Sequence, residues 1–147
     1  MQIDRRNVLT GAALLGGGMS AVAPGIALAQ HSHSGHSAPV PSLALMSSHC
    51  VLTGEICLEH CLQSLSTGDA SLAECARLVT DLTAACTALK TLAVNKSRNL
   101  YIFAVGVRAI CNSCEQECRK HAEHHQTCKD CADACAQCRA EIGKLKL

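Results

Sequence analysis

The chain has 147 residues, of which 12 are cysteine and only two, one Tyr and one Phe, are aromatic. Its formal net charge is +1, and it has no basic stripe that would provide the electrostatic footprint of a nucleic-acid-binding protein. Because aromatic burial contributes so little, another residue type has to fill the core, and the cysteines are the obvious filler. The length suits one domain behind a targeting segment.

Residues 1–29 have the features of an export signal. Arg5-Arg6 precede an uncharged stretch from about Val8 to Leu28, and Ala27-Leu28-Ala29 is a small-x-small cleavage site. The paired arginines resemble a twin-arginine signal, whose route carries proteins already folded. We therefore expect export to the periplasm, or to another extracytoplasmic compartment, after the thiols have loaded in the reducing cytoplasm. An ordinary secretory signal or an uncleaved anchor is the alternative interpretation.

Cleavage after Ala29 leaves a chain that begins at Gln30, and we expect no membrane insertion of this mature chain. Residues 30–41 consist mainly of His, Ser, Gly, Ala and Pro, a composition that predicts a flexible leader. The histidines of this leader either bind a divalent metal loosely or belong to a solvated linker.

Cap and turn signals predict a first pair of helices. The first helix runs from a Ser42 cap to about Ser66. Thr67-Gly68-Asp69 then breaks the helical pattern. The second helix opens with a capping box formed by Ser71 and Glu74 and continues to about position 94.

A second pair of helices follows a short connection at residues 95–97. The third helix runs from about Arg98 to Glu123, and a break near residues 124–126 separates it from the fourth. Thr127 is predicted to cap the fourth helix, and Gly143 lies near its C-terminus. Four helices joined by short loops predict an all-α protein, an up-down-up-down four-helix bundle over residues 42–147.

The cysteines occur in four blocks with helical spacing. At about 100° per residue, each block falls on one face of its predicted helix. In a bundle, leucine usually occupies the helix face that points inward, so we predict a core lined with thiols. Toward the turn between the second and third helices, ordinary apolar residues occupy this inward face instead. The twelve candidate metal ligands are Cys50, Cys57, Cys61, Cys75, Cys86, Cys111, Cys114, Cys118, Cys128, Cys131, Cys135 and Cys138.

Counting residues from the two turns predicts which cysteines share a level in the bundle. We place the first turn at Gly68 and the second near Gln126. The pairs predicted to share a level are Cys61 with Cys75, Cys50 with Cys86, Cys118 with Cys135, and Cys114 with Cys138. Cys75 is the cysteine most readily explained as a small buried apolar residue that binds no metal.

A core lined with thiols suits a soft metal, and Cu(I) is the first candidate. Cysteines four residues apart on a helix place their Cβ atoms about 5–6 Å apart, so two sulfurs can converge on one ion. One Cu⁺ per thiolate is neutral, whereas Zn²⁺ with four thiolates carries two negative charges. Because this chain supplies no inward basic residues to offset buried charge, we predict multiple Cu(I) ions.

Four other interpretations of the cysteines stay open. An even cysteine count in an exported chain is typical of disulfides, although neighbours on one helix have poor geometry for bridging. An iron–sulfur cluster on the fourth helix would need a spacing unlike that of bacterial ferredoxins. A thiol–disulfide oxidoreductase could use Cys111-x-x-Cys114 or Cys128-x-x-Cys131, and a zinc or mixed-metal buffer could use the same thiols. We find no nucleophile–base constellation, phosphate loop or dinucleotide motif, and therefore predict no enzyme.

The twin-arginine leader, the cysteine-filled bundle and the repeated Cys-x-x-x-Cys pairs resemble the exported copper storage proteins of bacteria. The resemblance implies that all twelve cysteines bind Cu(I) and that the chain forms a homo-oligomer, a tetramer. It also implies His or Met ligands near the open end of the bundle, for which Met46, His121 and His125 are candidates because they continue cysteine faces. The copper would be stored for a copper-requiring client protein or simply detoxified.

Overall fold

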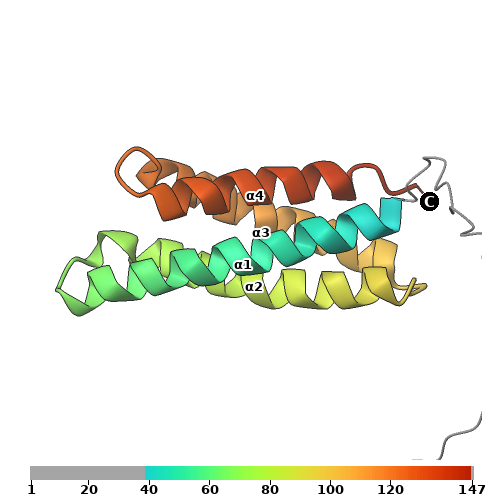
Figure 1. Ribbon diagram of the computed structural model, residues 1–147, viewed down its shortest axis with the longest axis horizontal. Helices are drawn as coiled ribbons and strands as arrows, with labels where there is room; N and C mark the ends of the chain where they lie inside the picture. The colour runs from blue at the N-terminus through green and yellow to red at the C-terminus, as the bar shows by residue number, and fades with distance from the viewer. Residues whose placement is uncertain (1–38, 147) are drawn as a thin grey trace, which may run out of the picture. The chain divides into compact units, whose positions relative to one another are not determined.

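The computed structural model describes residues 39–146, so the predicted signal and most of the predicted leader lie outside the described residues. Its helices are α1 (Pro39–Ser66), α2 (Ala73–Val94), α3 (Leu100–His121) and α4 (Gln126–Ile142), with a short 3₁₀ turn, η1 (Ala70–Leu72), before α2. Consecutive helices run antiparallel (Figure 1), and α1 and α3 each pack against both α2 and α4. The predicted up-down-up-down four-helix bundle is confirmed.

The first helix begins at Pro39, three residues before the predicted Ser42 cap. Two prolines are compatible with a first helical turn, because the amide hydrogens that they lack have no helical partner there. Ser42 therefore lies inside α1, where its hydroxyl donates to Glu141 Oε2 on α4 at 2.7 Å. The prediction of a Ser42 cap was wrong.

The predicted capping box at the second helix is also wrong. Asp69, rather than Ser71, is the capping residue, and its Oδ1 accepts from the Ser71 amide at 2.9 Å. The 3₁₀ turn that follows delays α2 until Ala73, and no side chain caps that helix start. Glu74 lies 3.5 Å from Arg77 instead.

The second hairpin turns earlier than predicted. α3 ends at His121, whose carbonyl accepts from the amides of His124 and His125 at 3.1 and 2.9 Å. This tight turn allows α4 to begin at Gln126 with His125 as its N-cap residue. Thr127, the predicted cap, lies in the first turn of the helix, and its Oγ1 is buried without a hydrogen-bond partner among residues 39–146.

The core has two parts, and its buried side chains all come from α1–α4 and η1 in the described part of the chain. Near the α2–α3 connection it is apolar, with Leu43, Leu89, Leu100 and Val107 among its buried residues. Toward the other end, where the α1–α2 and α3–α4 turns meet (Figure 1), buried cysteines replace them. Within residues 39–146, no helix combines the length and the apolar character that crossing a membrane requires.

Candidate metal centre

All twelve cysteines are free thiols, and each is completely buried. This burial confirms their predicted inward placement: each spacing of three or four residues returns the side chain to the same helix face, and that face packs into the bundle. The sulfurs of all four helices thus lie in the core of the bundle.

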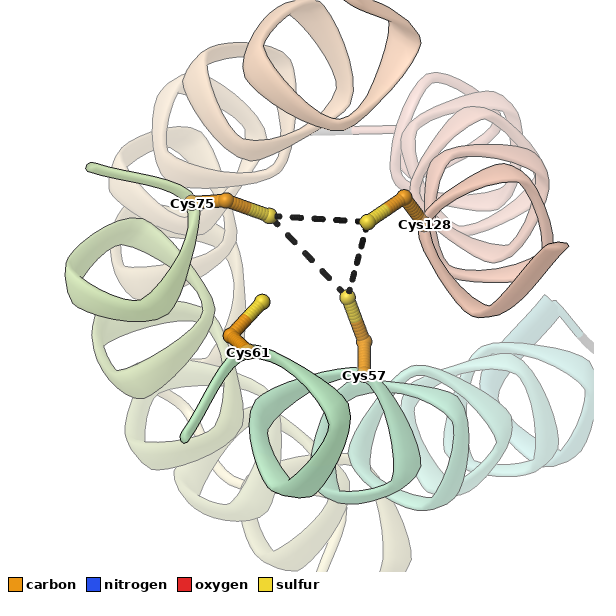
Figure 2. Close-up of side chains that lie close together, drawn as sticks. All are labelled: Cys57, Cys61, Cys75 and Cys128. Atoms are coloured by element: carbon orange, nitrogen blue, oxygen red, sulfur yellow. Dashed lines mark hydrogen bonds between the residues drawn. The ribbon is translucent and has the colours of Figure 1, made fainter. Parts of the chain in front are cut away.

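The thiols nearest the two turns form a group of four. The sulfurs of Cys57, Cys61, Cys75 and Cys128 all lie within 4.8 Å of one another. Figure 2 shows them converging from α1, α2 and α4, with Cys61 beside a triangle formed by the other three. The triangle's edges are 4.0 Å for Cys57–Cys75, 3.7 Å for Cys57–Cys128 and 4.0 Å for Cys75–Cys128. Helices distant in sequence therefore share one small cluster of sulfurs.

Two groups of three thiols continue this cluster along the bundle axis. One consists of Cys57, Cys118 and Cys131, and the next of Cys114, Cys131 and Cys135. Cys57 belongs to the first two groups and Cys131 to the last two, so neighbouring groups have a sulfur in common. The Cys114 sulfur lies 3.9 Å from Cys118 and 4.0 Å from Cys131.

The last group borders the apolar part of the core. Cys50, Cys86 and Cys138 lie within 4.8 Å of one another, and Cys111 lies 3.9 Å from Cys86. The Cys50 thiol donates to the carbonyl of Ala134 at 3.2 Å. The neighbouring thiols of Cys111 and Cys114 raise the pKa of Cys135, so Cys135 lies between this group and the preceding one. The twelve thiols therefore form one continuous column.

The predicted register is right for one hairpin and wrong for the other. Cys61 shares a group with Cys75, and Cys50 shares one with Cys86, as predicted. In the second hairpin, however, the groups pair Cys118 with Cys131 and Cys114 with Cys135. These partners lie one helical turn from those predicted, because the α3–α4 turn comes earlier than Gln126.

Cys75 is not an isolated apolar filler. Besides its place in the group of four, its sulfur lies 3.5 Å from that of Cys118 on α3. It therefore joins the sulfurs of α1 and α4 to those of α3, and it has the surroundings of a candidate ligand.

Contacts between the buried thiols shift their pKa values in both directions. Thiols of Cys118 and Cys128, together with burial, raise the pKa of Cys57, and those of Cys111 and Cys138 raise the pKa of Cys86. Conversely, donation from Cys57 and Cys61 lowers the pKa of Cys128. The thiols whose pKa is raised stay protonated until a cation replaces their protons.

Three histidines lie beside the four-thiol end of the column. His60 Nε2 and His125 Nδ1 are 2.8 Å apart, and the rings of His121 and His125 have centroids 6.3 Å apart. His121 also lies 3.4 Å from Glu117 Oε1. His121 and His125 are candidates from the sequence, whereas His60, which lies off the cysteine face of α1, is not among them. The only signal for it is its position next to Cys61, in the last turns before the loop.

Met46, the remaining candidate, lies one turn before Cys50 in α1. It is partly buried and packs against the core at the other end of the column. Among residues 39–146, the groups of possible metal ligands contain only cysteines, so neither the histidines nor Met46 completes a cluster there.

Comparison with known proteins agrees with this arrangement. A family model described as copper storage protein matches residues 39–146, the whole of the bundle. The chain belongs to the copper storage protein family. All twelve cysteines lie inside the region that this family shares.

A solved structure of a family member has the same fold. The Cu(I)-bound copper storage protein BsCsp3 superposes with a TM-score of 0.67 at 22% sequence identity, covering 75% of this chain and 100% of that one. No curated protein matches the chain.

Proposed function

We propose that this protein stores multiple Cu(I) ions on the thiolates that line its bundle. The observation that carries the proposal is the continuous column of twelve buried, unpaired thiols in which neighbouring groups share Cys57 and Cys131. A soft monovalent ion that accepts two or three thiolates fits groups of three and four sulfurs. Membership of the copper storage protein family supports the same function.

The proposed ligands are the twelve cysteines, with accessory ligands at the two ends of the column. His121 and His125 extend it at the turn end, where His60 joins them through its contact with His125. Met46 extends it beyond Cys50. An imidazole can take a Cu(I) ion from solvent or from a carrier before thiolates bind it more tightly, and the thioether adds a soft ligand at the inner end of the column.

Copper enters, in this proposal, at the turn end. The opposite end is closed by the buried side chains of Leu43, Leu89 and Leu100, which offer no ligand to a metal ion. From the four-thiol group an ion moves by exchanging one sulfur at a time, and the shared Cys57 and Cys131 let it change groups without leaving thiolate. Such transfer requires no large rearrangement of the helices.

We propose no catalytic role. A thiol–disulfide oxidoreductase needs a reactive cysteine that its substrate can reach. Cys128, at the start of α4, has a lowered pKa but no exposed surface. A Cys128→Ser variant should therefore lose a small part of the copper capacity, whereas an oxidoreductase would lose all of its activity.

Zinc is a second candidate ion for the four-thiol group. A tetrahedral site with Zn–S bonds of about 2.3 Å has sulfurs about 3.8 Å apart, close to the 3.7–4.0 Å edges of the Cys57–Cys75–Cys128 triangle. The double negative charge of such a site is unfavourable in a buried interior. Zinc would in any case occupy one group and leave most of the column free.

The compartment and the assembly are also proposals. The export signal over residues 1–29 supports a periplasmic or other extracytoplasmic store, loaded before a twin-arginine translocation. A homo-oligomer, a tetramer by family resemblance, is supported by the exposed Leu45, Leu52 and Ile56 on one face of α1. The store serves a copper-requiring client or protects the cell from copper.

The test is an anaerobic titration of the reduced chain, without residues 1–29, with Cu(I) in the presence of a competing chelator. Thiols and bound copper are counted in the same samples. Uptake approaching one ion per cysteine supports the store, and a parallel titration with Zn²⁺ is expected to stop at about one ion. Saturation with one or two copper ions, or thiols already paired in fresh protein, would contradict the proposal.

A further inference from the structure

The charges of the bundle are separated along its axis. The level of Cys50, Cys86, Cys111 and Cys138 divides the helices into two parts. On the turn side, residues 51–85 and 112–137 carry ten acidic and four basic residues. On the other side, residues 39–49, 87–110 and 139–146 carry one acidic residue, Glu141, and seven basic ones: Lys90, Lys96, Arg98, Arg108, Arg139, Lys144 and Lys146. The closed, apolar end of the bundle is therefore its basic end.

The basic residues at this end are mostly free to act on a partner. Lys144 and Arg139 form ion pairs with Glu141 and Glu115. Among residues 39–146, no ion pair involves Lys90, Lys96, Arg98, Arg108 or Lys146. Unpaired cations on one surface attract an anionic partner over about a Debye length.

The same end exposes a cluster of large apolar side chains. The first half of α3 buries Leu100, Ala104 and Val107, yet Ile102 is 73% exposed and Val105 is 53% exposed. Tyr101 and Phe103 are also partly exposed. A helix that is apolar on all sides is usually covered on all sides. The outer face of this part of α3 is apolar but exposed, so it lacks a partner within the described chain.

The apolar and basic residues form one surface. A groove of about 720 Å³ at the end of the bundle is lined by residues that include Arg98, Tyr101, Lys144 and Lys146. Tyr101 also lines an adjoining groove together with Val105 and Arg108. We define the basic apolar surface as Arg98, Tyr101, Ile102, Val105, Arg108, Lys144 and Lys146.

We propose that the basic apolar surface docks on an anionic phospholipid bilayer. Lipid headgroups supply the negative charge that Arg98 and Arg108 match, and the boundary between headgroups and acyl chains accepts Ile102, Val105 and the Tyr101 ring. Docking would direct the acidic end, where the column opens, away from the bilayer and toward a copper donor or client.

Charge favours a bilayer over a second copy of the chain at this surface. In a symmetric dimer the same patch meets itself, so this basic surface would be brought against an identical basic surface. Like charges brought together in an interface weaken it. The uncharged stripe Leu45, Leu52 and Ile56 on α1, the helix diagonal to α3, has no such obstacle.

The experiment is sedimentation of the chain without residues 1–29 with lipid vesicles, since that part contains the whole bundle core. Vesicles of phosphatidylcholine alone are compared with equal parts of phosphatidylcholine and phosphatidylglycerol, at about 0.05 M and about 0.5 M NaCl. We expect binding only to the anionic vesicles, and weaker binding at high salt. Each Lys or Arg near an anionic surface strengthens binding about fivefold, so Arg98→Glu with Arg108→Glu should weaken it at least about 25-fold.

Two matched controls separate the surface from general effects. Arg77→Glu with Lys129→Glu makes the same change in net charge on the acidic half and should leave binding nearly unaltered. Ile102→Ser should weaken binding, whereas Leu62→Ser, at an exposed position of α1 outside the Leu45, Leu52 and Ile56 face, should not. Absent binding, equal binding to neutral vesicles, or equal effects of the two charge reversals would overturn the proposal. If Ile102→Ser changed the molecular mass of the assembly in solution but left vesicle binding unchanged, the proposal would also be overturned, and the surface would be an interface between copies of the chain. Copper uptake, measured in parallel, is expected to stay constant throughout.

Discussion

The sulfurs of Cys75 on α2 and Cys118 on α3 lie 3.5 Å apart, the shortest hydrogen-bonding contact between two thiols within residues 39–146. This contact joins the four-thiol group to the rest of the column, since Cys75 also lies 4.0 Å from Cys57 and from Cys128. Removal of this one sulfur should therefore affect copper binding more than removal of a peripheral thiol.

A Cys75→Ala variant tests that link. We expect the copper capacity to fall by about one to two ions, because three neighbouring thiols lose a shared sulfur. Transfer from the turn end to the Cys50 end should also slow. The measurement is chelator-competition titration with stopped-flow uptake, and Cys138→Ala serves as the matched control at the far end. An unchanged capacity would identify Cys75 as a filler of the core.

Leu89→Ala separates stability from metal capacity. Leu89 is fully buried in the apolar part of the core, so the cavity should lower the free energy of unfolding of the copper-free protein by about 2–5 kcal/mol. Capacity should be unaltered, since no thiol is removed. Urea denaturation measures the first quantity and copper titration the second. Leu62→Ala, at an exposed position of α1, is the control and should change stability by less than about 0.5 kcal/mol.

Gly54 permits the close packing of α1 on α2. A Cβ at this position would lie 2.8 Å from Cγ2 of Thr83, a short side chain held by its hydrogen bond to Thr80. Gly54→Ala should therefore destabilise the bundle by about 1–3 kcal/mol, despite the better helix propensity of alanine. In Gly54→Ala with Thr83→Ser the colliding methyl group is gone, so the Gly54→Ala penalty should vanish. Thermal unfolding of the unmodified protein, the two single variants and the double variant gives the coupling energy between Gly54→Ala and Thr83→Ser. If the stability effects of the two substitutions simply add, a steric origin is excluded.

The copper-free protein should lose stability at high pH. Hydrogen bonding of the protonated Cys57 thiol to Cys118 and Cys128, with burial, raises the pKa of Cys57 above its ordinary 9.0. In the unfolded chain this thiol releases its proton near its ordinary pKa, whereas in the folded chain it keeps it. The unfolded state therefore binds fewer protons above about pH 9, and the free energy of unfolding falls there by up to about 1.4 kcal/mol per pH unit for each such thiol.

Copper should abolish this dependence, because bound thiolates have already lost their protons. Anaerobic urea denaturation at about pH 8 and about pH 10, with and without Cu(I), measures both effects. A flat profile for the copper-free protein would show that its thiols ionise as readily in the fold as in the unfolded chain.

Local patterns in the sequence were enough to predict the helices and the inward direction of the thiols. The spacing of Cys111, Cys114 and Cys118 places them on one face of a helix whatever surrounds it, and the structure buries all three. The helix caps were less predictable. Asp69 and His125 hold the positions that Ser71 and Thr127 were expected to hold. Asp69 accepts from the Ser71 amide, whereas His125 makes no side-chain cap hydrogen bond, so the polar residue types near a turn do not by themselves identify the N-cap.

The sequence by itself determined that four amphipathic helices point twelve thiols toward one shared core, since periodicity alone fixes which side chains share a helix face. Only the tertiary structure decided which thiols meet across helices. The α3–α4 turn lies about two residues earlier than predicted. Because α3 and α4 are antiparallel, the residue of α4 opposite a given residue of α3 changes by twice that number. Cys118 therefore lies at the level of Cys131 rather than at that of Cys135. The His60–His125 contact and the groove that Arg98 and Lys144 line likewise bring together residues that are distant in sequence, and no spacing along one chain segment encodes such an encounter.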